Sequence, residues 1–398
     1  MAEGLHASQP AMRPNGVRWG GVTVALLLAG CSGVVPRTQG PGPAAPPPRH
    51  APGQPSRLPD EARDRVAVLV PLTGAEAGIG QSIANAANMA LIDSGGSAIR
   101  ITMYDTATAT GAAAAAQRAI AEGNGLILGP LLSSDVREVA PVAAAAHVPV
   151  VSFSNDVDVA GRGVYLMGFT PTESIDRVVD YAHERGLVRI AVLIPNGLYG
   201  RRSSNAVIKA AEGAQSTVVS MQGYDRSPAS LSAAIKKLGD PKGYDALLIA
   251  DSGRIALVAA PLVRKSGSSA RLLGTELWNT EPALASARPM GGAWFAAVSD
   301  GLYGQFAAKY RARFGKAPFR LATLGYDSVL LTVRIAGDWR PGSTFPEARL
   351  TDKGGFSGVD GAFRFDRDGI AERMLEVKQI GAGGVTVVSP AAQGFGGR

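Results

Sequence analysis

The chain has 398 residues and a formal net charge of +7, with 50 Gly, 26 Pro and one Cys. That length allows one two-lobed unit or two ordinary domains. No apolar run reaches the roughly 18 to 20 residues of a membrane-spanning helix, which excludes a polytopic membrane protein. Residues 1–30 carry +1 and residues 31–63 carry +2, which leaves +4 on the rest. This small net positive charge argues against a nucleic-acid partner.

The first 30 residues are typical of a secretory signal. Arg13 and Arg18 precede a short apolar core over 22–28, and the segment ends Leu-Ala-Gly before Cys31. This ending resembles the bacterial lipobox, which predicts that Cys31 is lipidated and becomes the new N-terminus. A single cysteine also excludes intramolecular disulfides, a CxxC redox pair and a Cys-ligated structural zinc site.

Residues 31–63 follow as a lipidated cysteine and a proline-rich tether. With so few large apolar side chains the tether forms no core, and we expect an extended linker. Ser32 follows the cysteine, and in similar lipoproteins a residue other than Asp at this position goes with sorting to the outer membrane. The sequence therefore predicts a protein that is lipid-anchored on the periplasmic face of the outer membrane. Met1 and Met12 both remain open as the start.

From residue 64 onward, short apolar runs alternate with helix-length segments. The runs are continuous, as in parallel strands that are covered on both faces. Repeated alternation of this kind predicts an α/β fold with two doubly wound lobes. The expected strands are 66–70, 99–104, 125–128, 148–153, 188–194, 217–222, 245–250 and 271–274. The expected helices are 79–94, 111–122, 133–146, 172–186, 200–213, 228–238, 252–266, 302–315 and 320–337.

The end of the chain reads differently. Segments 361–369, 374–380 and 385–388 resemble antiparallel strands joined by tight turns, and Asp368-Gly369 is a hairpin signal.

No catalytic constellation is present. Outside the leader and tether only His147 and His183 remain, and neither has ligand-like spacing to a second His or Cys. The residues that a metal site or a Ser/His/Asp triad requires are therefore not all present, so we expect neither an enzyme nor a cofactor. The glycine-rich stretch 74–80 opens a helix after a strand and suits close approach of a ligand or anion, but it matches no nucleotide motif.

Polar residues at strand ends indicate a binding cleft. Ser133 begins a predicted helix, and Asn155 and Asp156 follow the next strand. Tyr199 and Glu276 follow strands in the second half of the chain. Ligands of open α/β sheets lie outside the carboxyl ends of strands, although simple helix capping explains Ser133 equally well.

Over residues 64–390 the chain resembles a known family, the type I periplasmic-binding fold of the leucine/isoleucine/valine-binding proteins. More closely, it resembles the binding-protein-like domain of the LpoA-like activators of penicillin-binding proteins. The resemblance implies three crossovers between lobes, with lobe 1 at about 64–170 and 300–342, and lobe 2 at about 171–299 and 343–390. It rests on segments 66–74, 78–80, 88–93, 129–131, 148–150, 165–170, 196–200 and 358–368.

In the amino-acid binders of this family, a Ser, a Thr, a Tyr and a Glu hold the ligand. By position these fall here at Ser133, Asp156 beside Asn155, Tyr199 and Glu276. A carboxylate at Asp156 would repel the carboxylate of an amino acid, which argues against a free branched-chain amino acid.

Two functions follow from the resemblance. One is a non-catalytic outer-membrane lipoprotein that regulates peptidoglycan synthesis by binding and activating a bifunctional penicillin-binding protein. The alternative is a lipid-anchored solute-binding protein of an ABC transporter, for an amino acid or a related small ligand. We expect no counterpart of the helical-repeat domain that the best-known activators carry, because only the predicted signal segment and tether precede residue 64 in this sequence.

Overall fold

The computed structural model describes residues 63–95, 98–340 and 342–395. All of them belong to the second of the chain's two units, which begins at Ser56. The predicted signal segment, Cys31 and all but the last residue of the tether lie outside the described residues. No described helix combines the length and the apolar character that crossing a bilayer requires.

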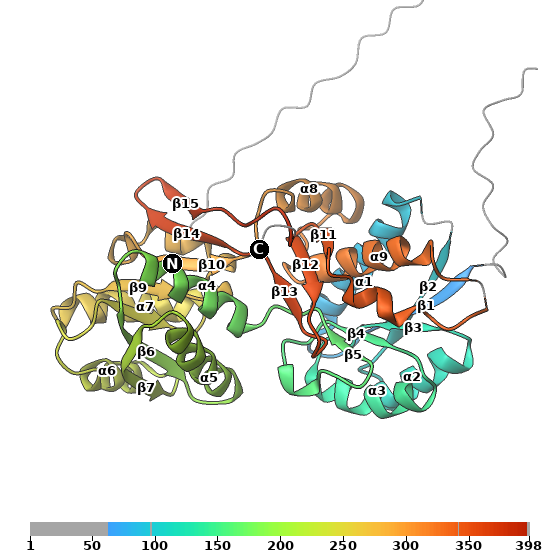
Figure 1. The fold of residues 1–398 in the computed structure, drawn as a ribbon, viewed down its shortest axis with the longest axis horizontal. Helices are drawn as coiled ribbons and strands as arrows, with labels where there is room; N and C mark the ends of the chain where they lie inside the picture. The colour runs from blue at the N-terminus through green and yellow to red at the C-terminus, as the bar shows by residue number, and fades with distance from the viewer. Residues whose placement is uncertain (1–62, 96–97, 341, 396–398) are drawn as a thin grey trace, which may run out of the picture. The chain divides into compact units, whose positions relative to one another are not determined.

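The first lobe is built on a parallel sheet of strand order β2-β1-β3-β4-β5 (Figure 1). Val66 and Val68 of β1 pack toward helices α1 and α9, whereas Ala67 and Leu69 pack toward α2 and α3. Both faces are thus covered, which is why the strands read as continuous apolar runs. The elements are β1 (Asp64–Val70), β2 (Ile99–Asp105), β3 (Leu126–Leu128), β4 (Val150–Ser152), β5 (Val164–Leu166), α1 (Ala77–Asp93), α2 (Gly111–Ala121), α3 (Ser133–Ala145) and α9 (Ala322–Ala336).

The second lobe has a sheet of order β15-β14-β10-β9-β8-β6-β7, in which β14 and β15 run antiparallel to their neighbours. Helices α4 and α5 cover one face, and α6 and α7 cover the other. The elements are α4 (Pro171–Glu184), β6 (Arg189–Pro195), α5 (Leu198–Gly213), β7 (Thr217–Tyr224), α6 (Pro228–Lys237), β8 (Ala246–Ile249), α7 (Gly253–Lys265), β9 (Arg271–Gly274), β10 (Trp294–Ala297), β14 (Glu376–Gly381) and β15 (Gly384–Ser389).

A small antiparallel sheet of order β11-β12-β13 and helix α8 complete the first lobe. Phe356, Phe363 and Phe365 of this sheet pack into the same core as β1. The elements are α8 (Tyr303–Phe314), β11 (Phe356–Gly358), β12 (Gly361–Phe365) and β13 (Ala371–Arg373). Short 3-10 helices are η2 (Val157–Val159), η3 (Glu276–Thr280), η4 (Pro282–Ser286), η5 (Arg288–Met290) and η6 (Glu347–Thr351).

The chain crosses between the lobes three times, after β5, after β10 and after β13. The third crossover lies later than the sequence predicted, because we expected residues from 343 onward in the second lobe. Instead Phe345, Leu350 and the aromatic residues of the small sheet are buried in the core of the first lobe. The antiparallel pairing of β14 with β10 returns the chain to the second lobe.

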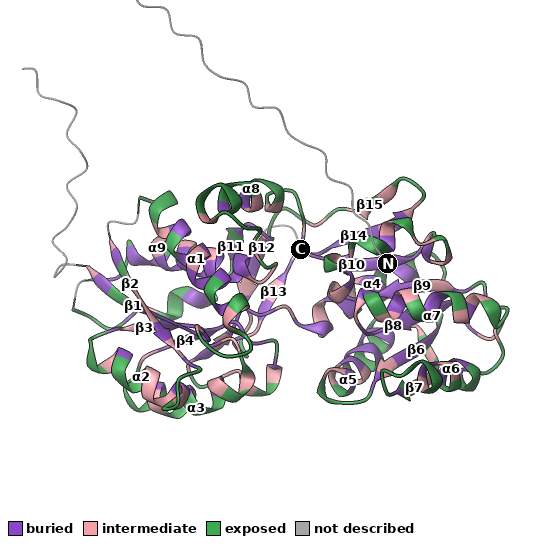
Figure 2. Cartoon of the chain, turned by 180° about the vertical axis from the view of Figure 1, so that it is seen from behind, coloured by how far each residue is buried: buried purple, intermediate pink, exposed green. Residues whose placement is uncertain are grey.

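The predicted α/β architecture is confirmed. The eight strands and nine helices predicted in chain order all coincide with observed elements, and the tail is antiparallel as expected. Strands β10, β11 and β13 were missed, although the run Trp-Phe-Ala-Ala of β10 is wholly buried. Figure 2 shows the strands largely buried and the outer sides of the helices exposed.

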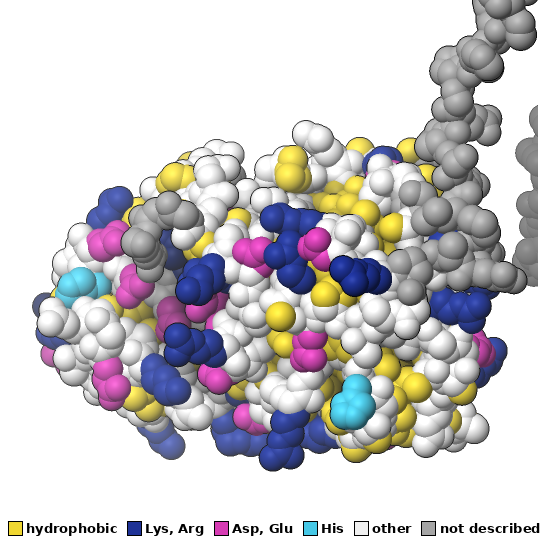
Figure 3. Space-filling view, turned by 45° about the vertical axis from the view of Figure 1, so that its right-hand side comes forward, with side chains coloured by type: hydrophobic (Ala, Val, Ile, Leu, Met, Phe, Trp, Pro, Cys, Tyr) yellow, Lys and Arg dark blue, Asp and Glu magenta, His cyan; other side chains and the backbone are white. Residues whose placement is uncertain are grey.

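Charges of both signs are mixed on the face of the molecule that Figure 3 shows. Figure 3 shows Lys and Arg side chains lying beside Asp and Glu rather than gathered in one large basic area. Ion pairs between exposed side chains include Arg118 with Glu122 and Arg364 with Glu372.

Candidate functional site

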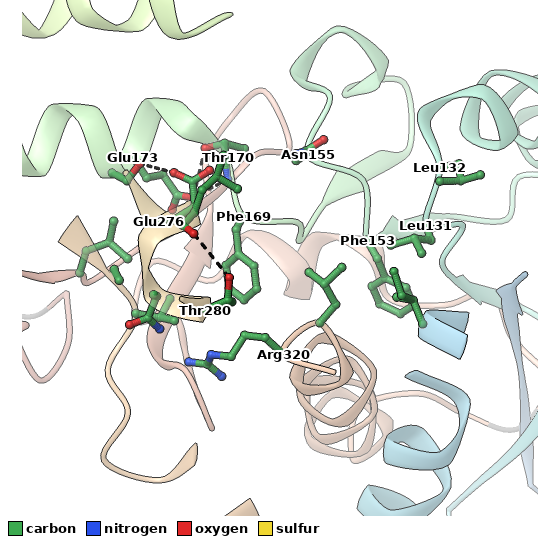
Figure 4. Close-up of a pocket in the computed structure, with 18 of the residues that line it drawn as sticks. Leu131, Leu132, Phe153, Asn155, Phe169, Thr170, Glu173, Glu276, Thr280 and Arg320 are labelled. Atoms are coloured by element: carbon green, nitrogen blue, oxygen red, sulfur yellow. Dashed lines mark hydrogen bonds between the residues drawn. The ribbon is translucent and has the colours of Figure 1, made fainter. Parts of the chain in front are cut away.

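A cavity of about 460 Å³ lies between the two lobes (Figure 4). Its volume falls within the roughly 300 to 1,000 Å³ of small-ligand sites. Most of its walls are apolar. The lining residues are Glu76, Ile79, Leu131, Leu132, Phe153, Asn155, Phe169, Thr170, Glu173, Ser174, Glu276, Leu277, Asn279, Thr280, Ala297, Val298, Arg320, Leu321 and Leu375.

Glycines bring helices close to the strands that precede them. A Cβ on Gly80 would lie 1.8 Å from the carbonyl oxygen of Pro71, and one on Gly200 would lie 1.7 Å from that of Pro195. The two lobes therefore begin their first strand-helix units in the same way. The glycine-rich stretch 74–80 was expected to admit a ligand. In the structure the missing side chain of Gly80 makes room for the backbone, while Glu76 and Ile79 line the cavity.

Glu276 begins η3, directly after β9, and faces the cavity (Figure 4). Its carboxylate accepts hydrogen bonds from the hydroxyl of Ser174 and, at 3.0 Å, from the hydroxyl of Tyr199. Burial raises the pKa of the Glu276 carboxyl, although these two hydroxyls oppose the shift. Within the described part of the chain, no cation forms an ion pair with it.

Glu173 lies near Glu276 in the first turn of α4 (Figure 4). It closes a capping box with Thr170, whose amide and hydroxyl donate to the Glu173 carboxylate at 3.4 and 3.1 Å. The amide of Arg373 donates to it at 2.7 Å, and the Arg373 guanidinium lies 3.6 Å away. Burial raises the pKa of Glu173, and the charge of Arg373 opposes that shift. Unlike Glu276, Glu173 therefore has a cationic partner.

Arg320 is the positively charged residue among the side chains that line the cavity. Its guanidinium lies 2.6 Å from a carboxylate oxygen of Asp360 and 3.4 Å from one of Asp300. It also stacks 4.0 Å from the centre of the Tyr303 ring. Two carboxylates and an aromatic face thus hold Arg320, whose side chain is 12% exposed.

The structure places two of the five predicted ligand residues, Glu276 and Asn155, on the cavity wall. Tyr199 lies behind Glu276 and orients its carboxylate. Ser133 does not line the cavity, and its hydroxyl accepts a hydrogen bond from Arg137 at 3.3 Å.

Asp156 also does not line the cavity, contrary to the expectation that it would face a ligand's carboxylate. Its side chain is 1% exposed and forms ion pairs with Arg137, at 2.7 Å, and with Arg202 of the second lobe. Its charge is thus balanced by protein side chains.

Sequence reasoning did not single out Glu173, Ser174 or Arg320 as lining residues. The Thr-Pro-Thr-Glu run over 170–173 is a capping-box signature that could have located Glu173. Arg320 enters the site from the segment that returns to the first lobe and carries no local signal.

The comparisons agree on the fold. A family model described as periplasmic binding protein matches residues 65–384. A protein of Rickettsia prowazekii described as uncharacterized is 24% identical over 175 residues, which is 44% of this chain and 47% of that protein. The chain thus spans about half the length of this curated relative.

Two solved structures match nearly their whole length. A putative branched-chain amino acid ABC transporter protein from Rhodospirillum rubrum has a TM-score of 0.71 at 21% identity, covering 82% of this chain and 100% of that one. A solute-binding protein of an ABC transporter from Rhodopseudomonas palustris, in complex with 3,4-dihydroxy benzoic acid, has a TM-score of 0.63 at 18% identity, covering 83% and 99%. At such identities the similarity shows the fold.

Proposed function

The chain belongs to the periplasmic binding protein family, and on that premise we propose that it is a non-catalytic solute-binding protein that presents a small ligand to an ABC transporter. The observation that carries this proposal is the cavity of about 460 Å³ between the lobes. Its apolar walls and the carboxylate of Glu276 provide the two elements of a small-molecule site, a surface to bury and a polar group to orient.

Solute binding is favoured over the regulation of a penicillin-binding protein, which the sequence put first. Both solved relatives described above are named as parts of ABC transporters, and one of them holds a small aromatic acid. A regulator that works through surface contact has no need of such a cavity.

The family places the folded part in the periplasm or another extracytoplasmic compartment. Lipidation at Cys31 and anchoring on the periplasmic face of the outer membrane belong to the proposal. Mass measurement of the membrane-extracted chain tests the lipid, because diacylation at Cys31 adds a defined mass to a chain cleaved after residue 30.

Thermal unfolding of the full-length chain in mild detergent tests the function. The panel contains amino acids, amines, aromatic acids and a purified bifunctional penicillin-binding protein. A ligand that binds the native state raises the melting temperature, because binding adds free energy of unfolding. This added stability is about 2.7 kcal/mol when the ligand concentration is 100 times Kd. We expect at least one small molecule to do so.

A cavity-filling variant locates the binding. Leu277→Trp puts a large side chain into the cavity and should abolish the ligand shift. Leu302→Trp makes the same change at a residue that is 53% exposed and outside the lining, and should leave the shift intact. Stabilisation by the penicillin-binding protein alone would overturn solute binding in favour of the regulator.

A further inference from the structure

The cavity carries more acidic than basic groups. Three carboxylates line it, those of Glu76, Glu173 and Glu276, against the single guanidinium of Arg320. Arg320 is held by Asp300 and Asp360, and Arg373 behind the wall is held by Glu173 and by the carbonyl oxygens of residues 167 and 168. The charge of each cation is thus balanced by protein carboxylates.

Neutral donors around the cavity are also largely engaged. The hydroxyls of Thr170 and Ser174 donate to the two buried glutamates. Asn279 donates to Asp300 at 3.4 Å and accepts from Lys378 at 2.8 Å. A ligand carboxylate would therefore find few donors, and an unpaired anion in a partly dehydrated site is costly.

The start of α3, where Ser133 was predicted to bind a ligand, is already occupied by an acidic residue. Asp135 lies in its first turn, where the helix dipole favours an anion. Asp156 is bonded to Arg137 of the same helix. This helix end therefore offers little further attraction for an anionic ligand.

Glu276 presents the opposite situation. Its carboxylate faces the cavity, accepts hydrogen bonds from the hydroxyls of Ser174 and Tyr199, and has no ion-pair partner among the described residues. A ligand ammonium beside Glu276 would donate a charge-assisted hydrogen bond to its carboxylate. No described cation of the protein makes this contact. Apolar side chains, including Leu277, Phe153 and Phe169, form the wall elsewhere.

We propose that the cavity selects a primary amine with an apolar body and no carboxylate group. The ammonium binds Glu276, and the apolar body packs against the hydrophobic wall. This inference rests on the proposed solute-binding function and names the class of its ligand.

Three ligands with one shared body test it on the full-length chain: 2-phenylethylamine, phenylalanine and 3-phenylpropionate. Calorimetric titration should show the amine binding at least tenfold more tightly than phenylalanine, which corresponds to about 1.4 kcal/mol. The acid should bind more weakly still. A second set, of 3-methylbutylamine, leucine and 4-methylpentanoate, should give the same order.

The outcomes separate the two proposals. If phenylalanine, leucine or an acid binds as tightly as its amine, the amine inference is wrong and solute binding stands. If neither amine binds while another member of the wider panel does, the result is the same. If no small molecule binds, both proposals fail. This comparison uses the unaltered chain, so it does not depend on how any variant folds.

A charge-removing variant tests the role of Glu276. Glu276→Gln keeps the shape of the side chain and should weaken amine binding at least tenfold. Glu212→Gln is the matched control, because Glu212 is an exposed carboxylate on α5 that does not line the cavity. It should change the affinity less than threefold. Equal losses in the two variants would contradict a specific contact at Glu276.

Discussion

Replacing Asp156 by asparagine tests whether a buried ion pair joins the two lobes. Asp156 follows β4 of the first lobe and is 1% exposed, while Arg202 lies on α5 of the second lobe and is 12% exposed. Burial alone would raise the pKa of Asp156, but bonds from Arg202, the Asp158 amide and Arg137 outweigh it and lower the pKa. A lowered pKa means that this stabilisation is present at neutral pH and is lost as the pH falls below about 4.

The magnitude follows from the burial of each partner. Removing one member of a buried pair costs about 3 to 5 kcal/mol, because the remaining charge stays buried without a partner. Arg137 is 54% exposed, so its share is less than about 1 kcal/mol. The amide oxygen of the introduced asparagine can still accept the Asp158 amide, which donates to Asp156 at 3.1 Å. We therefore expect a loss near the lower end, about 3 kcal/mol.

Urea unfolding at pH 7, followed by fluorescence and by circular dichroism, measures this loss. Asp158→Asn is the matched control, because Asp158 is 69% exposed and lies 3.9 Å from the same guanidinium. It should cost less than about 0.5 kcal/mol. The double variant Asp156→Asn with Arg202→Gln should lose less than the two single losses added together. A D156N variant no less stable than D158N would refute the reasoning.

Three further results are expected. Gly358→Ala should destabilise the chain by about 1 to 3 kcal/mol in urea unfolding, because its Cβ would lie 2.2 Å from a carboxylate oxygen of Asp327; wild-type stability would contradict that close approach. Burial and the nearby charge of Asp360 raise the pKa of Asp327 to about 7, so its contribution to stability is lost as the pH rises through that value. Asp327→Asn should therefore flatten the fall in stability between about pH 4 and 7, and an unchanged slope would contradict the assignment. Burial and the nearby charge of Glu173 raise the pKa of Glu276, so amine affinity should rise with pH in calorimetric titrations, and a flat profile would contradict ionisation of Glu276 in the complex.

The sequence was sufficient for the layered architecture but not for the boundary between lobes. Continuous apolar runs identify strands that are covered on both faces, and they located β1, β6 and their neighbours. The same runs do not tell which lobe a late segment joins. Phe345 and Phe363 pack with β1 through contacts far apart in the chain, which local periodicity does not encode.

The candidate site was predictable where a residue's position after a strand also fixes its direction. Glu276 lies two residues after the end of β9 and lines the cavity. Asp156 also follows a strand, but its charge is taken up by Arg137 and Arg202, which come from two different helices. Only the tertiary structure shows which polar residues pair with each other and which remain for a ligand.

A crystal structure of the chain grown with 2-phenylethylamine tests most directly whether the cavity binds an amine through Glu276. We expect ligand density in the cavity, with the amine nitrogen about 3 Å from the Glu276 carboxylate and the ring against Phe153 or Phe169. An empty cavity under saturating ligand, or a ligand bound elsewhere on the molecule, would contradict amine binding at Glu276.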